Sequence, residues 1–469
     1  MKKVLLVGSN FLRAPYPVSP VGLCMVAAAL APDWQVRIFD PLLDGADLAA
    51  VVGEFAPDYV GLGIRNIDDV VMEEGVSFVN DVRERFARPL RRLTRAPLIL
   101  GGSGFSIFPQ EWLEECEADY GVVGEGEAAF PSLLAALERG RDPLAIPGVV
   151  APGSPPPLRA ARPVLLDLLP FAEIDKRIDY APYRERGAYP IQTKRGCARR
   201  CVYCSYPQIE GRTFRCRPAE SVVDEIQQVS GRLGDVAFEF VDSVFNDPPG
   251  HAESICWEIA QRGLKPRLRT MGVNPAHVTR ELIDLMVTAG FAQIDSTPDS
   301  ASPAMLQRLR KNFSRADLER TATIVREAGM PTMWFFLLGG PGETEETIAE
   351  TFAFIDRFVD PEDMVHISEG LRIYPHTALY DTAVKEGFVE SGESLLTRHF
   401  YVSPELGRER LLEIVGREIA TRPNCVRSSE STPPPALLQE AVRIRREQGL
   451  TEPMFRTLLR LRRQALGGV

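Results

Sequence analysis

Histidine is scarce in this sequence: there are five in 469 residues, and all of them lie at or after position 251. The first part of the chain therefore has no imidazole with which to bind a metal or transfer a proton. Apolar runs are also short, since none approaches the roughly 20 residues that span a bilayer. The leading residues MKKVLLVGSN turn polar too soon for a secretory signal. We expect a cytoplasmic protein without a membrane anchor.

Acidic residues outnumber basic ones: the sequence has 54 Lys and Arg and 64 Asp and Glu, which give a net charge of −10. Such a balance argues against a surface built to bind nucleic acid. Cysteine is sparse as well, and eight cysteines in a chain of this length do not make a disulfide scaffold. Three of them fall within eight positions, which indicates reduced thiolates that serve a metal.

Short apolar runs separated by helix-length segments organise residues 1–150. The runs lie at 4–9, 36–40, 59–64 and 97–102, and each ends in glycine or polar residues. This order predicts an open α/β sheet of buried parallel strands, whose ligands lie beyond the carboxyl ends of the strands. The proline-rich stretch at 150–163 breaks the pattern, so we expect a linker over 151–185.

A second alternation of strands and helices occupies residues 186–394. Its six strand-like runs lie at 189–196, 236–242, 266–273, 292–297, 332–340 and 364–374. The pattern predicts a partial TIM-like βα barrel with its chemistry at the carboxyl ends of the strands. From 395 to 469 the pattern is helical, and we interpret its arginines as solvated helix faces. The predicted fold class is therefore α/β, with a Rossmann-like domain, a partial barrel and a helical C-terminal domain.

The three crowded cysteines have the spacing Cys-x3-Cys-x2-Cys, directly after the first barrel strand. Cys197, Cys201 and Cys204 can hold three irons of a [4Fe-4S] cubane and leave the fourth iron without a protein ligand. An open metal position is where substrate chemistry takes place. The alternative is a zinc site with Cys216 as the fourth ligand.

This loop, with Tyr203 before its last cysteine, resembles the signature of the radical S-adenosylmethionine (SAM) superfamily. The resemblance implies that the open iron binds SAM and that one electron cleaves it to a 5′-deoxyadenosyl radical. Segments 240–247, 295–300 with 309–313, and 337–344 resemble the family's cofactor-binding strand ends. By this resemblance the SAM-binding candidates are Asp242, Ser243, Ser296, Gly339, Gly340 and Gly342. Taken alone, a strand-end Asp-Ser is also typical of a turn or helix cap.

Segments 20–30, 101–106 and 120–130 resemble the cobalamin-binding domain that precedes the barrel in one branch of this superfamily, the branch with class B methyltransferases. The resemblance assigns Gly102, Ser103, Gly104 and Gly126 to the corrin. The axial histidine of the Asp-x-His-x-x-Gly motif is missing, because this domain contains no histidine. The alternative is a domain that binds no corrin and only shapes access to the barrel.

The resemblance implies methyl transfer through cobalamin to an unactivated carbon or similar centre of a small molecule or natural-product intermediate. An electron donor such as flavodoxin or ferredoxin would be the protein partner. One alternative is a corrin-independent rearrangement, cyclisation or transfer of another SAM-derived group. A tRNA methylthiotransferase would need three N-terminal cysteines, and only Cys24 and Cys116 lie there. The substrate cannot be read from the sequence. His376 is a candidate to face it, and the hydrogen donor or acceptor is open between Tyr206, Glu369, Tyr374 and Cys425.

Overall fold

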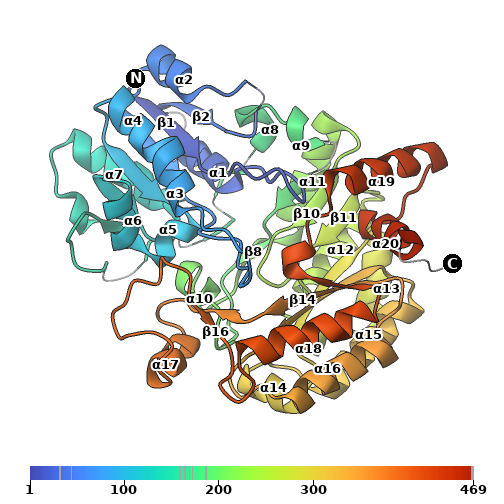
Figure 1. The fold of residues 1–469 in the computed structure, drawn as a ribbon. Helices are drawn as coiled ribbons and strands as arrows, with labels where there is room; N and C mark the ends of the chain where they lie inside the picture. Colours follow the sequence, from blue (N-terminus) through green and yellow to red (C-terminus); the bar gives the residue numbers. More distant parts are fainter. Residues whose placement is uncertain are drawn as a thin grey trace.

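The computed structural model describes residues 1–465 apart from 31–32, 44, 158–159, 163–164, 168, 172 and 185–186. Figure 1 shows an N-terminal α/β domain beside a larger barrel, with the C-terminal helices α19 and α20 on the far side of the barrel. Parts of the predicted linker over 151–185, together with residue 186 at the predicted start of the barrel, fall outside the described residues.

The N-terminal domain is a six-stranded sheet in the order β2-β1-β3-β4-β5-β6, and its last pair alone is antiparallel. The strands are β1 Lys3–Gly8, β2 Gln35–Phe39, β3 Tyr59–Gly63, β4 Leu98–Gly101, β5 Tyr120–Val122 and β6 Val149–Val150. The four strands predicted here from apolar runs are confirmed within one residue. β5 and β6 are too short for a run of apolar residues to indicate them.

Helices cover both faces of this sheet, and alternate residues of β1 pack into two separate hydrophobic clusters. Leu5 and Val7 face one cluster, whereas Val4 and Leu6 face the other. This burial on both faces explains why the strand is continuously apolar. The helical segments are α1 Val21–Leu30, α2 Leu48–Phe55, α3 Val79–Val82, η1 Arg83–Ala87, α4 Arg88–Leu93, α5 Ser103–Ile107, α6 Pro109–Glu115, α7 Gly126–Glu138 and η2 Pro143–Ala145.

The second domain is a partial barrel of parallel strands. One sheet has the order β11-β10-β7 and another β12-β13-β14-β17. Two parallel bridges, Leu268 to Phe291 and Val273 to Ser296, join them between β11 and β12. The strands are β7 Tyr189–Ile191, β10 Ala237–Phe240, β11 Arg267–Thr270, β12 Ile294–Asp299, β13 Thr332–Leu338, β14 Met364–Glu369 and β17 Cys425–Arg427. All six predicted barrel strands are confirmed, and β17 adds a seventh.

Helices pack against the outside of the barrel and begin where the sequence indicates. Thr279, Ser314 and Thr344 cap helices with side-chain oxygens that accept backbone N–H groups. The helices between barrel strands are α11 Ala219–Leu233, α12 His251–Gln261, α13 Arg280–Ala289, α14 Pro303–Arg308, α15 Arg315–Glu327 and α16 Glu345–Phe358, with the turn η3 Pro275–His277. Two small antiparallel pairs lie at its edge: β8 Lys194–Arg195 with β9 Arg215–Cys216, and β15 Leu371–Arg372 with β16 Phe400–Tyr401.

The barrel sheet continues beyond residue 394, where the sequence analysis begins the helical C-terminal domain. β17 pairs in parallel with β14, and α18 Arg408–Ala420 contacts both strands. A three-residue strand inside a helical stretch gives no periodic signal, which is why the sequence did not indicate it. The remaining elements are α17 Ala378–Lys385, η4 Ser428–Glu430, α19 Pro435–Gln448 and α20 Met454–Ala465.

The predicted linker also contains packed structure. α8 Ile174–Arg177 and α9 Ala181–Arg184 bury Ile174 and Tyr183 in the main hydrophobic cluster of the barrel. Asp40 of the N-terminal domain accepts a 2.5 Å hydrogen bond from the Tyr183 hydroxyl. This segment therefore ties the two domains together. No helix within the described residues is both long and apolar enough to cross a membrane.

Candidate functional site

The cysteine loop leaves the barrel after β8 and returns through α10 Tyr206–Ile209 to β9. Gly196 precedes the first cysteine with a φ of 88°, and a Cβ there would lie 2.1 Å from the Thr213 carbonyl oxygen. Only glycine fits this turn. The loop is thus clamped at its entry, at the edge of the barrel where the carboxyl ends of the strands meet.

Cys197, Cys201 and Cys204 are neighbours in the structure. Burial raises the pKa of each thiol, and the charges of the other loop cysteines raise the pKa of Cys201 and that of Cys204, the latter to about 12. Lys311 acts in the opposite direction on the last two thiols. Grouped thiols with raised pKa values become thiolates when cationic metal binds beside them.

The three sulfur donors suit iron, and their chemistry fits a cubane with one open iron. Cys216 is exposed on β9, and its pKa is set by burial, Lys194 and Asp242, not by the loop cysteines. Within the described residues, no three His, Cys, Asp or Glu side chains are grouped to hold a single metal ion.

Asp242 braces the backbone that leads into the cysteine loop. Its carboxylate accepts from the Thr193 N–H at 2.8 Å and the Thr193 hydroxyl at 2.6 Å, and from the Lys194 N–H and Nζ at 3.2 Å. Both of its oxygens are therefore engaged within the protein. Asp242 therefore positions the entrance of the loop, and its predicted contact with SAM stays a prediction.

Two further carboxylates fix the loop itself. Asp247 accepts two 2.6 Å hydrogen bonds from the Arg199 guanidinium, and Asp247 is fully buried. Asp299 accepts from the Tyr203 hydroxyl and, at 2.8 Å, from Lys311 Nζ. The sequence analysis missed Asp247, Asp299 and Lys311, because their partners lie 12 to 96 residues away along the chain.

Ser243 and Ser296 stand out among the predicted SAM-binding residues. Each hydroxyl oxygen is buried, and neither has a nitrogen or oxygen partner among the described residues. Buried polar atoms are normally paired, so an unpaired one calls for an explanation such as a bound ligand. Ser243 also lies beside the Cys197 thiol. These two orphaned hydroxyls fit a polar cofactor docked next to the cysteine loop.

The glycine turn after β13 is held by a buried carboxylate that the sequence did not single out. Gly339 and Gly342 have positive φ values of 98° and 74°, and a Cβ on Gly340 would lie 3.0 Å from Met305 Cε. Glu343 accepts from the Gly339 N–H at 3.2 Å and the Thr347 hydroxyl at 2.6 Å. Burial raises the pKa of Glu343 to about 7. Packing within the chain thus accounts for the three glycines, and a ligand contact is not needed to explain them.

The predicted corrin-binding glycines begin two helices at the carboxyl edge of the N-terminal sheet. Gly102, with a φ of 100°, and Gly104 lie so close to the backbone of Ile64 and Arg65 that a Cβ would come within 2.4 and 3.0 Å of carbonyl oxygens there. The Ser103 hydroxyl donates to the Arg65 carbonyl. A Cβ on Gly126 would approach Val26 at 2.9 Å. Close packing at this sheet edge therefore requires small residues, and their contact with a corrin stays a prediction.

The carboxyl edge of the N-terminal sheet packs against the cysteine loop. Val202, which lies between Cys201 and Cys204 in the loop, shares a hydrophobic cluster with Ile64, Phe105 and Phe108. α10 also contacts α5. The two predicted cofactor sites are therefore adjacent, and Figure 1 shows α5 and α10 side by side between the domains.

Buried ion pairs lock the two domains together around this junction. Arg372 Nε lies 2.9 Å from Asp68, with side-chain exposures of 1% and 0%. Arg195 contacts Glu127 at 2.6 Å and Glu125 at 3.1 Å. These pairs join residues 68 to 304 positions apart, so no local pattern in the sequence could indicate them.

The candidates for hydrogen transfer separate by position. Tyr206 and Tyr374 lie near Cys204: burial raises the pKa of both phenols, and the Cys204 charge adds a smaller upward shift. Glu369 forms a 3.3 Å ion pair with Arg427, and Cys425 is fully buried at the start of β17. His376 is exposed and lines a cavity with Cys201 and Cys204.

The fold is that of a two-domain α/β protein. The carboxyl edge of its Rossmann-like N-terminal sheet lies against a three-cysteine loop on a partial barrel. Comparison with known proteins agrees with this architecture. The model of the radical SAM superfamily matches residues 191–355, and the model of the B12 binding domain matches residues 10–134.

Among curated relatives, tryptophan 2-C-methyltransferase of Streptomyces laurentii is 28% identical over 80% of this chain and 73% of its own length. Cytidylyl-2-hydroxyethylphosphonate methyltransferase of Streptomyces wedmorensis is 23% identical over 84% of each chain. The solved structure of the radical SAM methyltransferase TsrM from Kitasatospora setae, with cobalamin and a [4Fe-4S] cluster bound, has a TM-score of 0.80 at 24% identity and covers all of both chains.

The chain belongs to the radical SAM superfamily, in the branch that carries a B12-binding domain ahead of the barrel. It is a radical SAM enzyme, as the resemblance of the cysteine loop and the downstream segments implies. The predicted fold class is confirmed, with a helical region at its C-terminal end.

Proposed function

We propose that this chain is a cobalamin-dependent methyltransferase that takes a methyl group from SAM and places it on a carbon, or a similarly unactivated centre, of a small molecule. The observation that carries the proposal is the contact between α10, directly after the cysteine loop, and α5 at the carboxyl edge of the N-terminal sheet, with Val202 of the loop in the same hydrophobic cluster as Phe105 of α5. A corrin at that edge and a cluster on the loop would share one chamber.

The residues of the chain have separable tasks in this proposal. Cys197, Cys201 and Cys204 hold the cluster, and the hydroxyls of Ser243 and Ser296 bind SAM beside it. When bound, cobalamin supplies a cobalt that can accept and release a methyl group. Asp242 holds the entrance of the loop, whereas Asp299 and Lys311 hold its far end.

The lumen of the barrel supports an apolar, flat substrate. On β13, Trp334 and Phe336 are buried against Phe354 of α16, so Met333, Phe335 and Leu337 face the other way, into the barrel, and are only half-buried. Phe335 stacks on His366 with ring centroids 4.7 Å apart. This wall offers an aromatic surface to a ring. Tryptophan is the first substrate to test, because one relative is a tryptophan methyltransferase.

The floor of the lumen is charged and closed by the N-terminal domain. The Tyr16 hydroxyl donates to Glu239 at 3.0 Å, and Arg269 lies 2.7 Å from the same carboxylate. Asp295 lies nearby, and burial together with the Glu239 charge raises its pKa to about 8. A substrate ammonium group would find carboxyl partners there, next to the aromatic wall.

The experiment is anaerobic reconstitution with iron, sulfide and cobalamin, followed by incubation with SAM and tryptophan. We expect S-adenosylhomocysteine to form only when cluster and corrin are both present, and Phe335→Ala to raise the KM for the accepted substrate. Formation of 5′-deoxyadenosine without any S-adenosylhomocysteine would instead favour a rearrangement or cyclisation.

We propose that the enzyme works in a reducing cytoplasmic compartment and needs a protein electron donor. All eight cysteines are free in the structure, which supports the reducing compartment.

A further inference from the structure

Strongly basic side chains line a cavity at the cysteine loop, and we call this lining the collar. A cavity of about 280 Å³ has Cys201 and Cys204 in its wall. Four arginines and a histidine complete the charged lining, and no acidic residue belongs to it: Arg199, Arg200, Arg212, Arg310 and His376. We call Arg200, Arg212 and Arg310 the collar arginines.

The collar arginines are available to a partner. All three are exposed, and none of their guanidinium groups forms a hydrogen bond or ion pair with any residue that the structure describes. Arg199 differs, because Asp247 neutralises it. Elsewhere on the surface, arginines are commonly paired, as Arg410 is with Glu345 at 2.7 Å.

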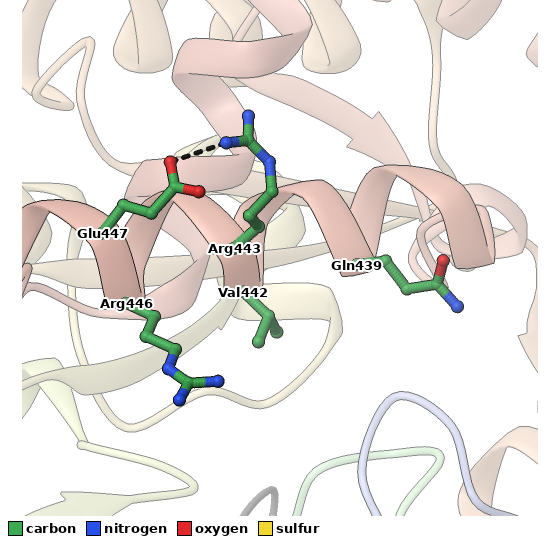
Figure 2. Close-up of a pocket in the computed structure, with 5 residues that line it drawn as sticks. All are labelled: Gln439, Val442, Arg443, Arg446 and Glu447. Atoms are coloured by element: carbon green, nitrogen blue, oxygen red, sulfur yellow. Dashed lines mark hydrogen bonds and ion pairs between the residues drawn. The ribbon is translucent and has the colours of Figure 1, made fainter.

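A second hollow, of about 570 Å³ on α19, provides a contrast (Figure 2). Arg443 there is bound to Glu447 at 2.6 Å, and Arg446 is the one arginine of that lining without a partner among the described residues. Since the chain as a whole has a net charge of −10, three unpaired arginines around two cysteines form a local reversal of sign. Such a reversal attracts a partner of negative charge.

We infer that the collar is the docking surface of an acidic one-electron carrier protein of the flavodoxin or ferredoxin kind, an inference that rests on the proposed function. The carrier's reduced centre gives up one electron and is oxidised, and the cluster held by the loop cysteines takes that electron and is reduced. Cys201 and Cys204 lie in the wall of the cavity, so a carrier seated on the collar approaches the cluster closely. Transient redox partners use small interfaces of this kind, steered by opposite charge.

The test compares the native chain with the variant Arg200→Glu, Arg212→Glu, Arg310→Glu, both loaded with the cluster. Stopped-flow absorbance follows cluster reduction by purified flavodoxin hydroquinone at low and high salt. We expect the second-order rate constant of the variant to fall at least about tenfold at low salt, and its salt dependence to disappear. The matched control is Arg446→Glu, which should leave the rate unchanged.

A small cationic electron donor distinguishes a loss of carrier docking in the variant from a change in the cluster itself. Reduced methyl viologen carries positive charge, so the triple variant should react with it as fast as the native chain or faster. Equal slowing with both donors, or a shifted midpoint potential in the variant, would overturn the inference, because the arginines would then act on the cluster. If the triple Glu variant does not fold, the three Arg→Gln changes should give a smaller loss in the same direction.

The remaining outcomes also have fixed meanings. An unchanged flavodoxin rate in a variant whose cluster methyl viologen reduces normally would overturn the docking site and leave the proposed function intact. A native cluster that neither donor reduces would overturn the proposed function. Tight binding of tRNA to the native chain that is lost in the triple variant would show that the collar is a nucleic-acid surface, which contradicts the inference.

Discussion

The Lys194 ammonium lies 3.2 Å from the Asp242 carboxylate, and the exposures of the two side chains are 1% and 0%. The pair stands directly ahead of the cysteine loop, and Lys194 Nζ also donates to the Phe245 carbonyl at 3.0 Å. Because a buried charge without its partner is costly, the pair sets the position of the loop more than it adds stability.

We therefore predict that Asp242→Asn destabilises the chain by about 3–5 kcal/mol in urea unfolding and lowers iron uptake, since it leaves the Lys194 charge buried. The double variant Asp242→Asn, Lys194→Met should recover much of that loss. The exposed pair of Arg267 with Asp235 is the control, and Arg267→Ala there should cost less than about 1 kcal/mol. An Asp242→Asn chain as stable as the native one would contradict the role of the brace.

Ser243→Ala and Ser296→Ala should weaken SAM binding without lowering stability. Neither hydroxyl has a nitrogen or oxygen partner among the described residues, so removing it breaks no such internal hydrogen bond, whereas a bound ligand would lose one. Calorimetric titration of the cluster-loaded chain with SAM should show about a tenfold rise in Kd, equivalent to roughly 1.4 kcal/mol.

Ser302→Ala is the matched control for these variants, because its hydroxyl is likewise buried without a partner among the described residues but precedes α14. Its SAM affinity should equal that of the native chain. A Kd for SAM that is unchanged in both Ser243→Ala and Ser296→Ala would show that these hydroxyls do not contact the cofactor.

Each of Cys197→Ala, Cys201→Ala and Cys204→Ala should abolish the visible cluster absorbance and most of the bound iron. Cys216→Ala should retain both, because this exposed residue on β9 is set apart from the three loop thiols. Iron analysis and electron paramagnetic resonance after reconstitution make the measurement. Loss of the metal in Cys216→Ala, with zinc in the native chain, would instead support a four-cysteine zinc site.

Glu343 predicts a particular dependence of stability on pH. Burial raises its pKa from 4.5 to about 7, so the folded chain keeps a proton that the unfolded chain has lost. The contribution of this group is full below its unfolded pKa and is lost as the pH rises through its folded pKa. Between about pH 5 and pH 7 the slope from one such group is at most about 1.4 kcal/mol per pH unit.

Glu343→Gln should flatten that slope, since an amide cannot lose the proton but can still accept from Gly339 N–H. Urea unfolding of the two chains across this pH range measures the difference. Parallel curves for Glu343 and Glu343→Gln would mean that the carboxyl is already ionised in the folded state.

Local signals in the sequence account for the parts of the structure that were predicted correctly. Apolar runs indicated four strands of the N-terminal sheet and six of the barrel. The missed strand β17 has three residues and depends on pairing with β14, which only the folded chain supplies. Strand pairing across long separations cannot be read from residue periodicity.

In the candidate site, too, local sequence signals indicated some features, whereas others depend on contacts between residues far apart in the chain. The spacing of the cysteines indicated the metal centre, and orphaned hydroxyls now support Ser243 and Ser296 as cofactor contacts. The sequence could not reveal that internal partners engage both oxygens of Asp242. Nor could it show the contact of Arg372 with Asp68, because the two residues are 304 positions apart.

The central claim is that one chain holds a cluster and a corrin side by side. The most direct measurement is the content of iron, sulfide and corrin after anaerobic reconstitution with an excess of hydroxocobalamin and removal of unbound ligand. The account predicts a cluster of four irons and one corrin per chain, with the corrin spectrum retained on gel filtration. A chain that keeps its cluster but elutes free of corrin would contradict it.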